Sequence, residues 1–259
     1  EAPASPVFEV LYDIGSRTRC EAELSGFGNI TFDARRKTIL ARLSYGDFFL
    51  AGGVTYDARI EPRSETYYPM PMESSSMDGW SRRDEPDDPT GDGFIVEAGL
   101  RRRIWEREKF ALQAYGQLTF RRESYDTVAT FMSYPVVVQG SPEIWPQPDP
   151  QPEPVTYTET YDMTLSGAEL SAGLIGACTG KRYTVYAGVE LTAYSDMEAD
   201  VTVTTSTDGS SYSEKSGVDR SNVVTLLLGL RASFDHGFVL VETRSLGETS
   251  LRAGAGLTF

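Results

Sequence analysis

Apolar and polar residues alternate along most of this chain, with the two-residue period of β-strands. In residues 94–105, one face of the predicted strand carries Phe94, Val96, Ala98 and Leu100. The other face carries Ile95, Glu97, Gly99 and Arg101. About ten such segments are bounded by turn residues, at 21–34, 38–45, 48–60, 94–105, 110–120, 165–178, 183–194, 223–234, 238–245 and 249–259. The pattern predicts an all-β, antiparallel fold.

The connections between the predicted strands alternate in length. Several contain only a few residues, such as Gly46-Asp47 and Asp235-His236-Gly237. Three others, at about 61–92, 121–164 and 196–221, are far longer than ordinary hairpin loops. Short turns at one end and long loops at the other are typical of transmembrane barrels. An even number of strands also returns both ends of the chain to the side with the short turns.

The final eight residues carry the most specific motif of the chain. They place a polar residue, a glycine, an apolar residue and an aromatic residue at Arg252, Gly254, Leu257 and Phe259. This spacing resembles the closing-strand signal of bacterial outer-membrane β-barrel proteins, which their barrel assembly machinery recognises. The resemblance implies an antiparallel, up-and-down transmembrane β-barrel with short periplasmic turns and long extracellular loops. It also implies an integral outer-membrane location, with membrane lipid and lipopolysaccharide as neighbours.

A soluble β-sandwich or lipocalin-like barrel would also alternate, but with its apolar face inward. Two observations favour the membrane barrel, in which the polar face lines the lumen. First, aromatic residues cluster at both ends of the strands, as in the two belts of a bilayer protein. Second, the polar faces carry charges of both signs, which could pair across a narrow lumen. This predicted lumen charge network comprises Arg42, Glu97, Arg101, Glu169, Glu190, Arg231, Glu242, Arg244 and Arg252.

Composition narrows the choice of function. The 259 residues carry a formal net charge of −14, which leaves no basic surface for nucleic acid. No run of apolar residues is long enough for a membrane helix. The start, Glu1-Ala-Pro-Ala-Ser-Pro6, resembles that of an exported chain whose signal peptide has been removed.

We divide the chain into residues 1–20, a periplasmic segment or mouth plug, and the barrel, residues 21–259. Residues 7–14 also alternate, so addition to a partner's sheet or an extra strand stays open.

Most of the negative charge falls in the predicted long loops. The first contains a group of carboxylates, namely Asp84, Glu85, Asp87, Asp88 and Asp92. Such a group could bind Ca²⁺, but its spacing differs from that of an EF-hand loop, which favours a solvated acidic loop without a cofactor. The second contains the Pro-rich run 145–154, a predicted polyproline II rod that acts as a spacer or a partner ligand. The third alternates Thr and Val and is expected to extend the wall as a hairpin.

Catalytic residues are difficult to find in this sequence. Ten-stranded outer-membrane proteases of the omptin kind use Asp–Asp and His–Asp pairs at the outer rim. The single histidine of this chain, His236, falls in a predicted periplasmic turn, so an enzyme is not expected. The two cysteines, Cys20 and Cys178, map to the predicted periplasmic rim, where a disulfide between them is an open alternative to two free thiols.

Two functional hypotheses remain. The first is a non-enzymatic barrel that anchors long acidic surface loops for structural, adhesive or partner-binding roles, with a surface or periplasmic protein as partner. The second is a narrow, porin-like channel for small solutes. Because channels of the porin kind use 16 or more strands, about ten strands favour the first hypothesis.

Overall fold

The computed structural model describes residues 5–24, 28–62, 80–82, 91–133, 155–205, 211–220 and 223–259. Among these residues no helix is both long and apolar enough to span a membrane. The described strands are β1 (Val7–Leu24), β2 (Gly28–Tyr45), β3 (Phe48–Pro62), β4 (Trp80–Arg82), β5 (Gly91–Arg107), β6 (Phe110–Ser133), β7 (Val155–Thr179), β8 (Tyr183–Thr205), β9 (Ser211–Arg220), β10 (Val224–Ser233), β11 (Gly237–Leu246) and β12 (Glu248–Thr258).

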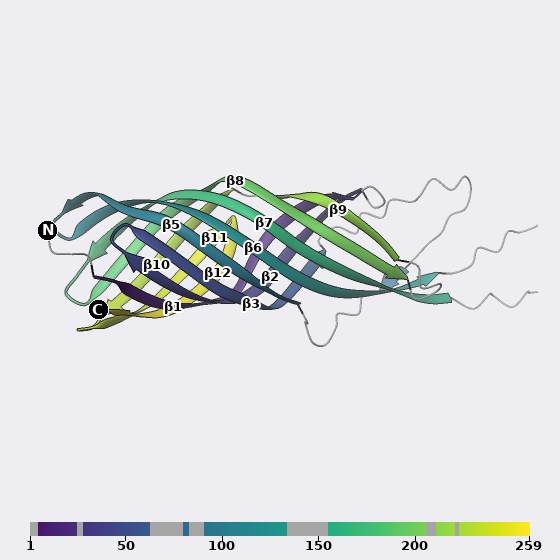
Figure 1. Cartoon of the computed structure of the whole chain (residues 1–259), viewed down its shortest axis with the longest axis horizontal. Helices are drawn as coiled ribbons and strands as arrows, with labels where there is room; N and C mark the ends of the chain where they lie inside the picture. The colour runs from purple at the N-terminus through teal and green to yellow at the C-terminus, as the bar shows by residue number, and fades with distance from the viewer. Residues whose placement is uncertain are drawn as a thin grey trace, which may run out of the picture.

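These strands form a closed, antiparallel barrel with ten strands around its wall. The ring runs β1-β2-β3-β5-β6-β7-β8-β10-β11-β12 and closes where β12 pairs with β1. Both chain termini lie at the end of the barrel where the short turns Gly46-Asp47 and Asp235-His236 also lie (Figure 1). We call this the turn end and the opposite end the far end. The predicted fold class is confirmed.

The set of strands that form the wall differs between the turn end and the far end. The β11–β12 hairpin is short, and beyond its tip β9 pairs directly with β1 through Cys20–Arg220 and Ala22–Val218. β9 is also paired with β8, so it continues the wall above β10. On the other side of the barrel β5 begins only at Gly91, which pairs with Ala58 of β3. The barrel therefore has fewer wall strands at the far end than at the turn end.

The N-terminal residues correct the predicted strand order. Residues Val7–Cys20 do not plug the mouth of the barrel, because they form most of β1, paired with both β2 and β12. The predicted first strand, 21–34, combined the end of β1 with the start of β2, and the predicted 38–45 strand is the rest of β2. Residues Arg35-Arg36-Lys37 fell between these two predicted strands. In the structure it lies within β2, next to a bulge in the pairing with β3.

The predicted long loops are partly strand. β6 and β7 pair continuously as far as Ser133 and Val155, so both ends of the predicted 121–164 loop belong to the sheet. β8 and β9 form a hairpin that runs to Thr205 and Ser211, which confirms the hairpin expected within 196–221. In Figure 1 these strands continue beyond the rest of the barrel wall at the far end. The polyproline rod expected at 145–154 lies outside the described residues.

An apolar band surrounds the outer surface of the barrel. Leu100, Leu118 and Leu228 are 49%, 51% and 55% exposed, whereas Glu97, at an inward position of β5, is 4% exposed. Exposed aromatics lie near both ends of this band, with Phe48, Phe110 and Phe234 at the turn end and Phe94, Phe120 and Tyr194 toward the far end. A surface of this kind is suited to contact with lipid. The predicted orientation, apolar side chains outward and charged side chains inward, is confirmed.

The interior at the far end is filled by apolar side chains. We call this group the outer apolar cluster, and its members are Cys20, Ala34, Ala58, Tyr125, Leu165, Met197, Ala199, Val201 and Val218. None is more than 8% exposed, and Met163 packs against them. They come from β1, β2, β3, β6, β7, β8 and β9, so side chains from the whole circumference meet at the centre. Two smaller apolar clusters are interleaved with charged groups nearer the turn end.

The two cysteines lie at opposite ends of the barrel. Cys20 is buried in the outer apolar cluster, whereas Cys178 is exposed near the turn that joins β7 to β8. Neither cysteine takes part in a disulfide, so the structure does not support the alternative in which the two are bonded. Cys20 was placed at the wrong end because residues 1–20 were separated from the barrel. In the structure β1 begins at Val7, so Cys20 lies thirteen residues along this strand toward the far end.

Candidate functional site: the charged barrel interior

The strands deliver charged side chains to the barrel interior by simple alternation, except at one bulge. On β1 the inward residues are Glu9, Leu11 and Asp13, and then the pairing register shifts between Ile14 and Arg17. The extra residue, Gly15, has a φ of +72°, a conformation that favours glycine. Because a one-residue bulge reverses the parity of the strand, Ser16 and Thr18 face inward beyond it. The bulge is therefore what places Ser16 in the charged layer.

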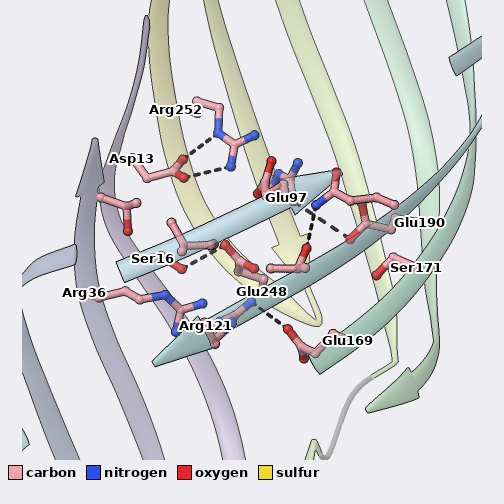
Figure 2. A pocket seen from close by; sticks show the side chains of 15 residues that line it. Asp13, Ser16, Arg36, Glu97, Arg121, Glu169, Ser171, Glu190, Glu248 and Arg252 are labelled. Carbon is pink, nitrogen blue, oxygen red and sulfur yellow. Dashed lines mark hydrogen bonds and ion pairs between the residues drawn. The ribbon is translucent and has the colours of Figure 1, made fainter. Parts of the chain in front are cut away.

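The first ion pair joins the two strands that close the barrel. Asp13 of β1 and Arg252 of β12 lie directly opposite one another. Arg252 donates two hydrogen bonds to the Asp13 carboxylate, from Nε at 2.8 Å and from a terminal nitrogen at 2.7 Å (Figure 2). Both residues are at most 6% exposed. This two-point contact has the strongest geometry available to an arginine and a carboxylate.

A second group surrounds Arg42 of β2. Its guanidinium lies 2.9 Å from Glu97 of β5 and 3.7 Å from Glu9 of β1. It also lies over the ring of Phe49, 4.8 Å from the ring centre. One arginine thus contacts two carboxylates from different strands and one aromatic face, which fixes its position in the lumen.

A third group lies next to the outer apolar cluster, on its turn-end side. Arg36 contacts Glu123 at 3.3 Å, and Glu123 also accepts a hydrogen bond of 2.5 Å from the Tyr125 hydroxyl. Arg121, two residues before Glu123, donates a 2.6 Å hydrogen bond to Glu169 of β7. Figure 2 shows Arg36, Arg121 and Glu169 converging on the same space from different strands. Glu123 and Tyr125 are 1% and 0% exposed, so their polar groups depend on these contacts.

The fourth group joins strands β6, β8 and β11. The Tyr115 hydroxyl donates to Glu190 at 2.6 Å, and the Tyr186 hydroxyl donates to Glu242 at 3.0 Å. Arg244 lies between these two carboxylates, 3.1 Å from Glu242 and 3.9 Å from Glu190. Tyrosines therefore supply part of the hydrogen bonding that the carboxylates need.

The residues predicted for the lumen charge network occupy two regions. Arg42, Glu97, Glu169, Glu190, Glu242, Arg244 and Arg252 belong to the ion-paired groups above. Arg101 lies nearer the turn end, where its side chain is exposed and its backbone N–H donates to Asp47. Arg231 is half-buried and stacks on Phe238, with its guanidinium 3.5 Å from the ring centre.

Sequence reasoning missed several members of the charged layer. Asp13 fell in a segment that we divided from the barrel, Arg36 in a supposed break, and Arg121 and Glu123 in a supposed loop. The parity of the predicted strand 110–120, continued past its end, would have placed Arg121 and Glu123 on the inward face. No pattern in the sequence indicates the bulge at Gly15.

A cavity of about 30 Å³ lies among residues that include Ser16, Gln117, Glu169 and Arg252 (Figure 2). That volume has room for about one or two water molecules. Ser16, which borders the cavity, donates a 2.8 Å hydrogen bond to Glu248. Within the described residues the acids and bases of this layer bind one another, an arrangement suited to closing the lumen.

The other predicted site residues are placed as follows. No group of side chains that could hold a metal ion occurs within the described ranges. Asp84, Glu85, Asp87 and Asp88 of the possible Ca²⁺ loop lie outside those ranges, and Asp92 is exposed on β5. Of the predicted assembly signal, Arg252 faces inward, while Leu257 and Phe259 are 52% and 70% exposed on the outer surface. Gly254 packs beside Leu11, where a side chain would clash. Recognition of these residues by assembly machinery stays a prediction.

Comparison with known proteins agrees with this architecture. No protein-family model matches the sequence, and no curated relative matches it. Among solved structures, the outer-membrane protease OmpT from Escherichia coli is similar, with a TM-score of 0.58 and 9% identity over 100% of this chain and 98% of that one. The translocator domain of the autotransporter NalP from Neisseria meningitidis matches with a TM-score of 0.39 and 13% identity, covering 98% and 88% of the two chains. The toluene transporter TodX from Pseudomonas putida matches with a TM-score of 0.32 and 10% identity, covering 100% and 91%.

The chain therefore has the fold of an outer-membrane β-barrel, with ten strands in a closed antiparallel wall. At 9% identity the likeness to the protease is one of fold. Fold alone does not determine function in this class, so a function must be argued from the interior and the far end of this barrel.

Proposed function

We propose that this chain is a non-enzymatic, non-conducting outer-membrane barrel that anchors surface-exposed segments. The turn end faces the periplasm, and the far end faces the cell exterior. The single observation that supports this most is the sealed interior. Nine side chains of the outer apolar cluster, each at most 8% exposed, fill the barrel next to the ion-paired layer.

A channel for small solutes is disfavoured by the same observation. Water and polar solutes cross a pore only where its lining offers room and polar contacts. Here the described side chains on the inward face of the far end include an apolar group with Tyr125, Leu165 and Val201, which pack on one another. The cavity found among the described residues of the charged layer, about 30 Å³, has room for about one or two waters.

Enzyme chemistry is disfavoured by the position of the histidine. Similarity in fold to a protease raises the possibility of peptidase activity. The only histidine of the chain, His236, is exposed in the turn between β10 and β11, at the turn end. A histidine general base at the cell surface would have to lie at the opposite end of the barrel.

The anchoring role is supported by the strands that continue past the barrel. β6 and β7 remain paired over residues 126–133 and 155–162, which corresponds to roughly 25 Å of extended chain. The segments that connect or follow these strands are rich in acidic, proline and serine residues. A closed barrel that presents such segments is suited to binding a surface partner, and not to transport.

The test combines electrical recording with cross-linking. In planar bilayers, the purified full chain is expected to insert without producing steady unitary conductance. In cells, a photo-cross-linking residue in place of Asp149, within the Pro-rich run, is expected to yield a protein adduct. The same residue in place of Leu118, on the lipid-facing wall, is the matched control and is expected to yield none.

Either of two results would contradict the proposal. Steady conductance from the pure protein would show an open lumen and favour the channel. The absence of an adduct from position 149 and from equivalent positions in the other two acidic segments would remove the anchoring role, even if the barrel proved to be closed.

A further inference from the structure

The strand pairing leaves an open sheet edge at the turn end of the barrel. β3 begins at Phe48, which lies opposite Leu100 of β5, whereas β5 continues to Arg107. On its other side, β5 stays paired with β6 along this whole stretch, as far as Arg107 and Phe110. Among the described residues, no strand pairs with the β3-facing side of β5 beyond Leu100. We call residues Arg102–Arg107 the β5 edge.

The backbone of the β5 edge has hydrogen-bonding groups that the described part of the barrel does not use. The Arg101 N–H donates to the Asp47 carbonyl at 2.6 Å, across the seam between β5 and the β2–β3 turn. Because a strand directs the backbone groups of alternate residues to the same side, the Arg103 N–H points toward the open edge. Polar groups of an open edge have no partner among acyl chains. The β5 edge therefore lies outside the hydrocarbon of the membrane, where a partner can reach it.

Large apolar side chains are exposed beside these backbone groups. The pairing of β5 with β6 shifts between Arg103 and Trp105, so Ile104 is the extra residue of a bulge. Ile104 and Trp105 are 54% and 51% exposed. Unused backbone donors next to exposed apolar side chains are the features of a surface that an additional strand covers.

The charge around the β5 edge is opposite in sign to that of the whole protein. Residues 101–109 contain four arginines, one lysine and two glutamates, a formal charge of +3, on a chain whose net charge is −14. Arg103 contacts Glu106 at 2.6 Å. Arg102 and Arg107 are exposed and make no ion pair with any described residue. These two arginines are available to a partner.

The order of side chains along the edge indicates the chemistry of that partner. Arg102 and Arg107 project from the outward face, on either side of Ile104 and Trp105. A strand that adds to a sheet places its side chains directly beside those of the edge strand. The matching segment has an acidic residue, an apolar residue and a second acidic residue at alternate positions. Its carboxylates then meet the two arginines, and its apolar side chain meets the apolar pair.

Other roles account for only part of this arrangement. Basic residues and bulges protect sheet edges from unwanted pairing, but protection alone gives no reason for large apolar side chains on the edge. Anchoring in lipid headgroups explains Trp105 but gives no role to the adjacent open edge. A second copy of the β5 edge, aligned by its apolar residues, would place arginine opposite arginine, which is unfavourable.

We propose that the β5 edge binds an extended, acidic segment of a periplasmic protein by β-strand addition. Backbone hydrogen bonds along the edge supply affinity, while Arg102 and Arg107 select for carboxylates. The apolar residue of the segment covers Ile104 and Trp105. The periplasmic location rests on the orientation proposed above, and the inference is independent of what the segments at the far end bind.

The first test measures peptide binding to the full chain in detergent micelles by fluorescence anisotropy. The probe is a labelled, end-blocked heptapeptide of threonine, with glutamate at its second and sixth positions and valine at its fourth. Arg103→Pro removes the edge N–H, because proline has none, and Arg103→Ala removes the same side chain but keeps the N–H. The proline variant is expected to bind the probe at least about tenfold more weakly than the alanine variant.

The second test measures the selection for acidic residues. Arg102→Gln/Arg107→Gln is expected to weaken binding of the same probe about fivefold, because two ion pairs with the peptide are lost. The matched control, Lys181→Gln/Arg182→Gln, removes the same charge from exposed positions in the β7–β8 turn, at the same end of the barrel. This control should bind the probe as the wild type does.

Two further arms use the wild-type chain alone and do not depend on the variants folding. A peptide with lysine in place of glutamate should bind at least about fivefold more weakly, and a peptide with an N-methylated backbone should not bind. Equal binding of the lysine peptide, equal binding by Arg103→Pro and Arg103→Ala, or equal loss in the turn control would overturn the proposal. Failure of the glutamate peptide to bind the wild type would also overturn it and leave Trp105 as a lipid anchor. None of these results bears on conductance or on surface cross-linking, so the anchoring role is tested separately.

Discussion

Replacement of Arg252 by methionine is expected to destabilise the barrel by about 3–5 kcal/mol, because it leaves the carboxylate of Asp13 buried without its partner. Arg252 makes both of its short hydrogen bonds to Asp13, and the two residues join the first and last strands of the ring. The loss therefore falls on the seam that closes the barrel. Unfolding in urea, followed by heat-modifiable gel migration of barrels refolded into vesicles, measures the change.

The control for this prediction is the double variant Asp13→Leu/Arg252→Met. Removing both charges and filling the space with apolar side chains should recover much of the stability that the single variant loses. Refolding in vitro separates this effect from any role of Arg252 in cellular assembly. A single variant as stable as the wild type would show that the ion pair is exposed to water and that the lumen is open at this height.

Replacement of Glu123 by alanine should also be strongly destabilising, by about 3–5 kcal/mol, because Glu123 has more than one buried partner. The change removes the carboxylate next to Arg36 and leaves the Tyr125 hydroxyl without its acceptor. It also opens a space beneath the outer apolar cluster. The midpoint of unfolding in urea should fall accordingly, relative to the wild type measured in the same vesicles.

An exposed ion pair provides the matched control for Glu123. Arg103 and Glu106 contact each other near the turn end with side chains that are each 55% exposed. Glu106→Ala should change the stability by less than about 1 kcal/mol, as is usual for exposed pairs. If Glu123→Ala and Glu106→Ala had the same small effect, the dense far-end interior described for this barrel would be incorrect.

Much of the wall could be predicted from the sequence, because alternation is a local property. In a strand without bulges, alternation places residues such as Leu100, Leu118 and Leu228 on the outward face, whichever strands are its neighbours. The alternation of short and long connections indicated the ends of the barrel, and an even count placed both termini together. These features do not depend on which strands are neighbours.

The strand boundaries could not be predicted where a charged residue lies within a strand. Arg36 fell between two predicted strands, and its partner Glu123 lies 87 positions later in the chain. Such a contact exists only after the barrel has closed. β6 continues after residue 120 and β7 begins before residue 165 for a related reason. In both stretches polar residues occur on both faces, so the sequence shows no alternation of apolar and polar positions.

The candidate site shows the same division. Arg42 and Glu97 were both predicted to belong to the lumen charge network, and the structure pairs them. Asp13 was missed because its segment was separated from the barrel, and the bulge at Gly15 reverses parity without a signal in the sequence. The same separation of residues 1–20 from the barrel placed Cys20 at the turn end, where Cys178 lies, and left open a disulfide that the barrel does not form.

Side-chain orientation in a bilayer tests the central claim most directly, namely that apolar residues face lipid while a sealed, charged interior faces the barrel axis. Spin labels would be placed singly at Leu118, which is 51% exposed on the outer face, and at its inward neighbour Gln117, in a chain whose two cysteines are replaced by serine. Collision rates with oxygen and with a water-soluble nickel chelate would then be compared. We expect position 118 to be accessible to oxygen and protected from nickel, and position 117 to be protected from both. Oxygen access at position 117 with protection at 118 would contradict the orientation, and nickel access at 117 would contradict the seal.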